Sequence, residues 1–64
     1  MQNKLKEIRE HKGISQDLLS QKSSVSRTTI SELENGKTKV VTNVTLEKIA
    51  SALGVSVKDI FFTN

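Results

Sequence analysis

The side chains with the clearest chemical potential lie on one face of a short stretch that follows position 26. At about 100° per residue, the spacing of an α-helix, Ile30 and Leu33 point to one side of this stretch. The opposite side carries a guanidinium, hydroxyls, a carboxylate and an amide, on Arg27, Thr28, Ser31, Glu32 and Asn35. Donors and acceptors of these kinds along an exposed helix suit the reading of base edges in the major groove of DNA. A solvated helix surface has a similar composition, so the surrounding pattern must decide between the two.

Catalytic and metal-binding chemistry lack their usual residues in this sequence. His11 is the only histidine and there is no cysteine, which excludes a cluster of imidazole or thiolate metal ligands. The serines have no histidine and carboxylate arranged around them for nucleophilic attack. A chain of 64 residues also has little room for a pocket of about 300 Å³ or more. We therefore expect no catalytic residues, no metal site and no cofactor.

Two short helices joined by a tight turn are predicted to position the polar face. The first spans about residues 16–22 and the second about residues 27–35, so that the whole unit covers about residues 16–35. Ser15 and Ser26 stand where a hydroxyl can accept a hydrogen bond from the first free N–H groups of each helix. Gly36 follows the second helix, at the position where a left-handed residue commonly ends one.

This arrangement resembles the helix-turn-helix of the Cro/repressor-type (Xre-like) DNA-binding family, which includes the lambdoid phage repressors. The resemblance implies an all-α fold, a compact five-helix lambda-repressor-like DNA-binding domain, with residues 1–64 as a single domain. Ser24 stands where the family usually has glycine, and a left-handed backbone there would cost about 1 kcal/mol relative to glycine. The matching residues are Ser15, Gln16, Leu19, Ser20, Val25, Ser26, Arg27, Ile30 and 33–36, together with the later stretch 49–61.

The resemblance and the helix geometry together assign the site residues. Reading of bases is expected from Arg27, Thr28, Ser31 and Glu32, at the start and one turn along the second helix. Contacts with the DNA backbone are expected from Gln16, Ser26, Asn35, Lys37 and Lys39. For Gln16 and Asn35, the resemblance carries this role. The resemblance also pairs Arg9 with Glu34 as a partly buried structural ion pair, the alternative being two separate surface charges.

The remaining stretches predict three further helices and an apolar surplus. We expect helices over about residues 3–12, up to about residue 53 and from Ser56 onward, the last with Asp59 completing a capping box. Six residues should be buried: Leu18, Leu19, Ile30, Leu33, Ile49 and Leu53. Near the end of the chain there are more apolar residues than a small core can bury, which suggests a dimer seam at Val57, Ile60, Phe61 and Phe62. Val40 and Val41 could either cover the core or form an exposed patch for a partner.

Composition and charge agree with a small DNA-binding regulator. The net charge is +3, and the excess lies in residues 1–40, which hold eight basic and five acidic residues. The expected partners are double-stranded DNA and a second copy of the chain, with a protein partner as a further one. The expected function is sequence-specific transcriptional regulation, by a small dimeric repressor that reads a near-palindromic operator. The alternative is an antitoxin or other protein-interaction module of a mobile element. Without an apolar leader or a span of about 18 apolar residues, no membrane association is expected, and the cytoplasm, or the nucleoid when DNA is bound, is the expected location.

Overall fold

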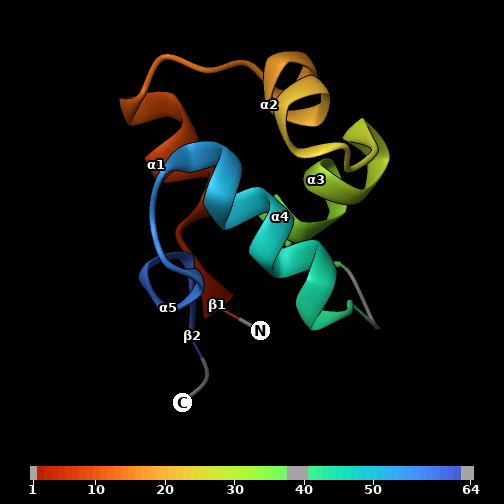
Figure 1. Cartoon of the computed structure of the whole chain (residues 1–64). Helices are drawn as coiled ribbons and strands as arrows, with labels where there is room; N and C mark the ends of the chain where they lie inside the picture. Colours follow the sequence, from red (N-terminus) through yellow and green to blue (C-terminus); the bar gives the residue numbers. More distant parts are fainter. Residues whose placement is uncertain (1, 38–40, 63–64) are drawn as a thin grey trace.

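The computed structural model describes residues 2–37 and 41–62, and five helices make up most of it (Figure 1). The predicted all-α, five-helix fold is therefore confirmed, with one addition: a short antiparallel pair of strands near the two ends of the chain. Within these described ranges, no helix is long and apolar enough to cross a membrane. The elements in order are β1 (Gln2–Asn3), α1 (Leu5–His11), α2 (Gln16–Ser23), α3 (Arg27–Glu34), α4 (Asn43–Leu53), α5 (Val57–Ile60) and β2 (Phe61–Phe62).

Side-chain caps set the starts of the later helices, as the sequence predicts. The hydroxyls of Ser15 and Ser26 accept hydrogen bonds from the backbone N–H groups of Leu18 and Thr29, respectively. Thr42 caps α4 in the same way, and Ser56 and Asp59 form the predicted capping box at α5. Each of these bonds satisfies a donor that would otherwise lack a partner within the helix.

The first helix is shorter than predicted. It begins at Leu5, because Asn3 belongs to β1 and its side-chain oxygen accepts a hydrogen bond from the N–H of Leu5 at 3.0 Å. It ends at His11, and Gly13 then takes a positive φ of 68°. Residues 3, 4 and 12, which the sequence prediction placed in this helix, therefore lie outside it.

The core lies where the inner faces of the helices meet. Five of the six side chains predicted to be buried are buried, at 3% exposure or less, but Leu18 is 39% exposed and that prediction is wrong. On α2 the inward stripe consists of Leu19 and Ser23, four positions apart, and Leu18 is turned about 100° away from it. The buried apolar residues are Leu5, Leu19, Val25, Ile30, Leu33, Leu46, Ile49, Ala50, Leu53, Ile60 and Phe61.

The two strands join the beginning and the end of the described chain. Gln2 pairs with Phe62 and Asn3 with Phe61, and the N–H of Lys4 donates to the carbonyl of Ile60 at 2.8 Å. Figure 1 shows β1 and β2 beside each other, next to α5.

The strand pairing overturns part of the predicted dimer seam. Ile60 is fully buried and Phe61 is 6% exposed, so both belong to the core of a single chain, and their assignment to a seam is wrong. The short strand turns Phe61 inward instead of leaving it on the surface. Val57 is half-buried against the same core, and the side chain of Phe62 lies outside the described residues.

The structure describes one of the two valines in the link between α3 and α4. Val41 is partly buried and packs on the core, as one of the two alternatives predicted. Val40 and Lys39 lie outside the described residues.

Candidate nucleic-acid interface

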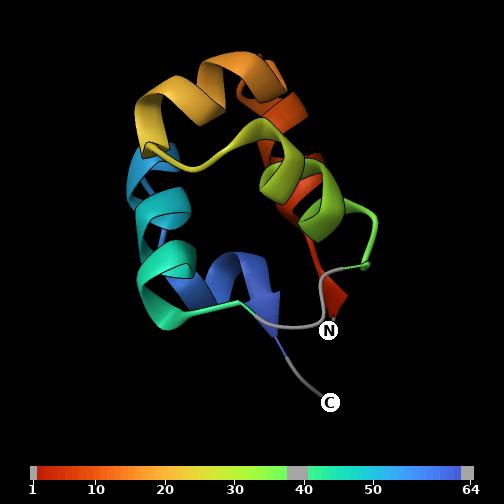
Figure 2. The ribbon, with the colours of Figure 1, turned by 90° about the vertical axis from the view of Figure 1, so that its right-hand side faces the viewer.

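The unit formed by α2, a three-residue turn and α3 stands at one side of the molecule (Figure 2). Ser24 ends α2 with a left-handed backbone, at a φ of 61°, and its N–H donates to the carbonyl of Ser20 at 2.9 Å. Val25 is buried in the turn and its N–H donates to the Ser23 hydroxyl at 3.2 Å. These contacts fix the direction in which the chain leaves α2 and enters α3.

The outward face of α3 has the predicted composition. Ile30 and Leu33 are buried, which holds the opposite side of the helix toward solvent. Of the four residues predicted to read bases, Arg27, Thr28 and Glu32 are exposed and Ser31 is half-buried. The structure thus places all four on one helix, with three of them exposed.

A buried ion pair holds the C-terminal end of α3, as the family resemblance predicts. Arg9 Nε donates to Glu34 Oε2 at 2.6 Å and Arg9 Nη2 to Glu34 Oε1 at 3.2 Å, a bidentate arrangement. The two side chains are only 11% and 3% exposed. The hydrogen bond to Glu34 raises the pKa of Arg9 above its ordinary value, against the opposing effect of burial. Arg9 Nη1 also donates to the carbonyl of Ile14 at 2.8 Å, so the guanidinium is satisfied on several sides.

Gln16 connects that buried pair to the exposed start of α3. Its Nε2 donates to Glu34 Oε1 at 3.0 Å, and its Oε1 accepts from Arg27 Nε at 3.4 Å. Because the amide nitrogen and oxygen each face a fixed partner, the orientation of the amide is determined. The side chain that the sequence assigned to the DNA backbone therefore also buttresses Arg27.

Two more of the residues predicted to contact the DNA backbone form hydrogen bonds at the two ends of α3. The Ser26 hydroxyl accepts from the Thr29 N–H at 3.2 Å and donates to the Thr29 hydroxyl at 2.8 Å. Asn35 Nδ2 donates to the carbonyl of Ser31 at 2.9 Å. Both side chains are exposed, as is Lys37, so all three remain accessible at the rim of the α3 face.

Sequence reasoning missed two contacts of α3. Asp17, in the first turn of α2, has its Oδ1 at 3.2 Å from Arg27 Nη1. Asn3 Nδ2 donates to the carbonyl of Leu33 at 2.9 Å and ties β1 to α3. Both pairs depend on how separate elements pack. The sequence contains one signal for the Asp17–Arg27 contact, an acidic residue in the first turn of α2 and a basic residue at the start of α3.

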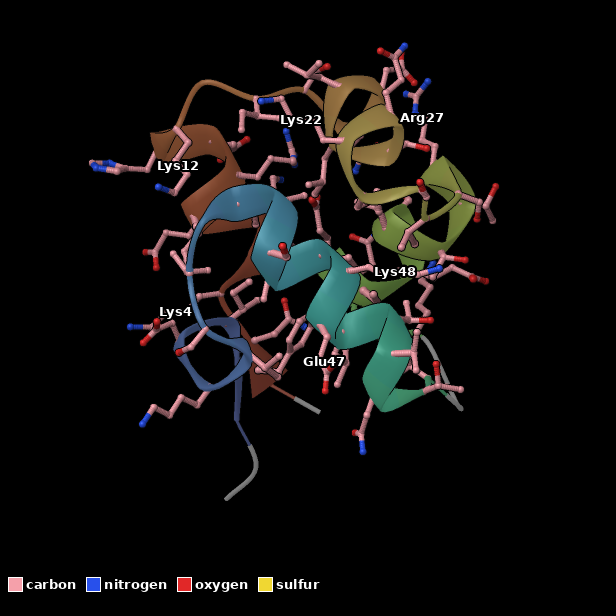
Figure 3. All side chains as sticks on the ribbon, in the orientation of Figure 1. Lys4, Lys12, Lys22, Arg27, Glu47 and Lys48 are labelled. Carbon is pink, nitrogen blue, oxygen red and sulfur yellow. The ribbon has the colours of Figure 1, made fainter. Side chains whose placement is uncertain are left out.

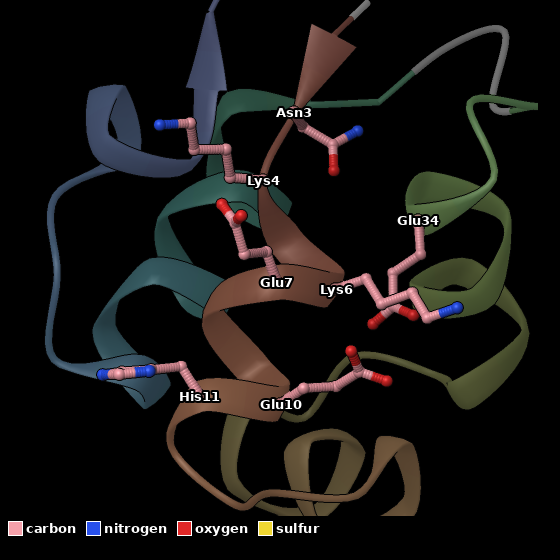
Figure 4. A pocket seen from close by; sticks show the side chains of 7 residues that line it. All are labelled: Asn3, Lys4, Lys6, Glu7, Glu10, His11 and Glu34. Carbon is pink, nitrogen blue, oxygen red and sulfur yellow. The ribbon is translucent and has the colours of Figure 1, made fainter.

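A shallow hollow elsewhere on the described surface lies along α1 (Figure 4). Its lining mixes basic and acidic side chains from α1 with Glu34 of α3, and His11 is at one end. Among the residues that the structure describes, no three histidine, cysteine or acidic side chains gather where they could hold a metal ion. The outward face of α3 therefore remains the candidate site that the sequence singled out.

Comparison with known proteins identifies the type of this unit. A family model described as helix-turn-helix matches residues 5–60. The chain belongs to the helix-turn-helix family. This assignment confirms the resemblance seen in the sequence, and it makes the chain a DNA-binding transcriptional regulator.

Two similar proteins agree with the family assignment. The control protein C.MunI of a Mycoplasma species is 40% identical over 60 residues, which cover 92% of this chain and 80% of that protein. A chain in the structure of the SinR protein/SinI protein complex superposes with a TM-score of 0.79 at 31% identity. That match covers 86% of this chain and 53% of the other, so this helix-turn-helix chain spans about half the length of its structural neighbour.

Proposed function

We propose that this helix-turn-helix protein represses transcription by binding a specific near-palindromic operator as a two-fold dimer. The observation that carries the proposal is the outward polar face of α3, on a helix whose other face is in the core and whose end is held by the Arg9–Glu34 pair. A reading helix must be rigid to discriminate between bases, because a loosely held donor can satisfy several of them. The buried pair and the apolar contacts supply that rigidity.

Each reading residue has a chemical preference in the major groove. Arg27 can give two parallel hydrogen bonds to O6 and N7 of one guanine, the commonest specific contact in such complexes. Thr28 can offer its methyl group to a thymine or its hydroxyl to other bases. One turn further along, Ser31 can donate or accept, and Glu32 can accept from the amino group of a cytosine.

The surrounding polar residues would set the docking position. Gln16 stands at the start of α2, where backbone N–H groups and the helix dipole favour a phosphate. Ser26, Asn35 and Lys37 are exposed around the reading face, and Lys39 follows in the sequence. Phosphate contacts of this kind fix register and orientation without carrying sequence information.

A dimer is proposed from the docking mode. Two reading helices about 34 Å apart would face successive major grooves, which requires an operator with near two-fold symmetry. Since Ile60 and Phe61 are in the core, the seam would use Val57 and Phe62, the other two predicted seam residues, with the Val40–Val41 loop as the next candidate. We place such a regulator in the cytoplasm, on the nucleoid when it is bound to its operator.

Selection from a random duplex library tests the proposal directly. The purified protein should enrich one sequence with two inverted half-sites whose centres are about 10 bp apart. Binding to the selected duplex should exceed binding to a scrambled duplex by about a thousandfold or more. Enrichment of no sequence, or equal affinity for both duplexes at every salt concentration, would contradict it.

A second candidate function is that of an interaction module, such as an antitoxin of a mobile element. It is favoured by two large apolar side chains on the described surface, Leu18 at 39% and Val44 at 59% exposure. The structural neighbour is itself recorded in a complex of two proteins. Affinity for duplex DNA that falls steeply with salt would favour the first function, and its absence the second.

A further inference from the structure

The reading arginine of α3 faces an acidic side chain of α2. Asp17 Oδ1 lies 3.2 Å from Arg27 Nη1, and the two side chains are 67% and 63% exposed. The pair therefore lies in solvent, at the outer edge where the starts of α2 and α3 meet, and Figure 3 shows Arg27 there. An ion pair this exposed contributes little to folding, so stability does not account for it.

Arg27 is held from a second direction by Gln16. Gln16 Oε1 accepts from Arg27 Nε at 3.4 Å, while Asp17 occupies Nη1. A guanidinium has five N–H donors, so the remaining donors of Arg27 are open to a ligand. The guanidinium is thus steered by two neighbours before any DNA arrives.

The carboxylate has different consequences for the two kinds of DNA contact. A phosphate offers Arg27 the same type of charge-assisted partner that Asp17 already supplies, and the phosphate is also repelled by that carboxylate. A guanine offers two uncharged acceptors, O6 and N7, which the open donors of Arg27 can meet. The pair therefore weakens the sequence-independent contact more than the sequence-specific one.

We propose that Asp17 is a specificity-determining residue, whose carboxylate keeps the Arg27 guanidinium from acting as a phosphate clamp and leaves it for a guanine. This proposal rests on the proposed function, because it takes Arg27 as a reading residue. Asp17 acts through Arg27 and is a positioning residue with no base contact of its own.

The pair itself can be tested without DNA. The sequence contains only two arginines, Arg9 and Arg27, so NMR spectra of the guanidinium groups contain one set of Nη–H signals from each, and that of Arg27 includes the nitrogen that faces Asp17. In Asp17→Asn, the Arg27 signal should shift and exchange with water at least about twofold faster, while the buried Arg9 signal stays unchanged and reports intact folding. An Arg27 signal that does not respond would overturn the proposal, whatever the protein binds.

The effect on specificity is measured with two probes, the duplex selected by the wild-type protein and a scrambled duplex of equal length. In Asp17→Asn, affinity for the scrambled duplex should rise by about twofold to fivefold per monomer, with a salt slope steeper by about one. Affinity for the selected duplex should rise less, so that the ratio of the two falls. Asp17→Glu, which keeps the charge, should keep the ratio within about twofold of the wild type.

Two controls separate positioning from a general change of charge. Glu47→Gln changes the net charge by the same amount on α4, far from Arg27 in Figure 3, and should leave the ratio unchanged. In an Arg27→Ala background, Asp17→Asn should no longer lower the ratio. If it lowers the ratio equally with and without Arg27, Asp17 acts by simple repulsion and the proposal is wrong. Failure of the wild type to prefer its selected duplex would instead contradict the proposed function.

Discussion

The two ends of α3 each carry an arginine–carboxylate pair, and the two pairs differ in burial. At the C-terminal end, Arg9 and Glu34 are 11% and 3% exposed, while at the N-terminal end Arg27 and Asp17 are 63% and 67% exposed. A buried charge that loses its partner cannot regain its hydration, whereas an exposed one can. The same chemical groups therefore fix the helix at one end and remain exchangeable for a ligand at the other. Gln16 is hydrogen-bonded to a member of each pair.

Breaking the buried pair should produce the largest change. Arg9→Met leaves Glu34 without its guanidinium in the interior, which should lower the free energy of unfolding by about 3–5 kcal/mol. Urea denaturation followed by circular dichroism measures this. The matched control is Arg27→Met at the exposed pair, which should cost less than about 1 kcal/mol.

A double-mutant cycle sharpens this result. Arg9→Met combined with Glu34→Gln should cost less than the sum of the two single changes, because neither charge is then left alone. Strictly additive costs would mean that the pair is not coupled in solution.

Removing the exposed arginine should affect binding and not folding. Arg27→Ala is expected to weaken binding to the selected duplex by about 1–3 kcal/mol and to relax the preference at one base pair per half-site. The free energy of unfolding should change by less than about 0.5 kcal/mol, as at most surface positions. Titration of the selected and scrambled duplexes measures the first effect. An equal loss on both would make Arg27 a phosphate contact.

Relieving the backbone strain of Ser24 tests the turn between α2 and α3, on which the positions of both ion pairs depend. Ser24 has a φ of 61°, so Ser24→Gly should raise the free energy of unfolding by about 1 kcal/mol. The comparison variant is Ser20→Gly inside α2, which should lower it by about 0.5–1 kcal/mol. The melting temperatures of the two variants should shift in opposite directions from that of the wild type. A destabilised Ser24→Gly would show that the serine contributes more than its backbone costs.

The smallest expected effect concerns a carboxylate in the capping box of α5. Asp59 accepts hydrogen bonds from the hydroxyl and the N–H of Ser56, and these lower its pKa. A lowered pKa in the folded state gives a stabilisation that is present above the unfolded pKa of about 3.9 and lost as pH falls through the folded value. The stability advantage of the wild type over Asp59→Asn should therefore be measurable by urea denaturation at pH 7 and shrink below pH 4. An advantage that grows on acidification would contradict the assigned hydrogen bonds.

Local patterns account for what could be predicted here. The caps at Ser15, Ser26 and Ser56 depend on neighbours a few positions away, and the core face of α3 follows from the spacing of Ile30 and Leu33. Both kinds of signal can be read within one helix. The fold and the outward polar face of α3 were therefore predictable.

The wrong and missed predictions concern residues whose positions depend on packing between distant segments of the chain. An apolar side chain such as Leu18 is placed inside or outside by the rotation of α2 against its neighbours, and composition does not determine that rotation. Phe61 was predicted to lie on the surface as part of a dimer seam, but it is buried where its strand pairs with Asn3. The contact between Asp17 and Arg27 likewise depends on the angle between two helices.

The pairing of β1 with β2 has a consequence for folding during synthesis of the chain. Ile60 and Phe61 complete the core, yet they are among the last of the described residues to be synthesised. Until these residues have been added, the apolar face of α4, which α5 contacts, is not covered by them. Contacts between distant segments also form late, because a long loop must close before they are made. A nascent chain can therefore form α3 before it can hold that helix firmly, and firm packing of the core should begin only once Ile60 and Phe61 are in place.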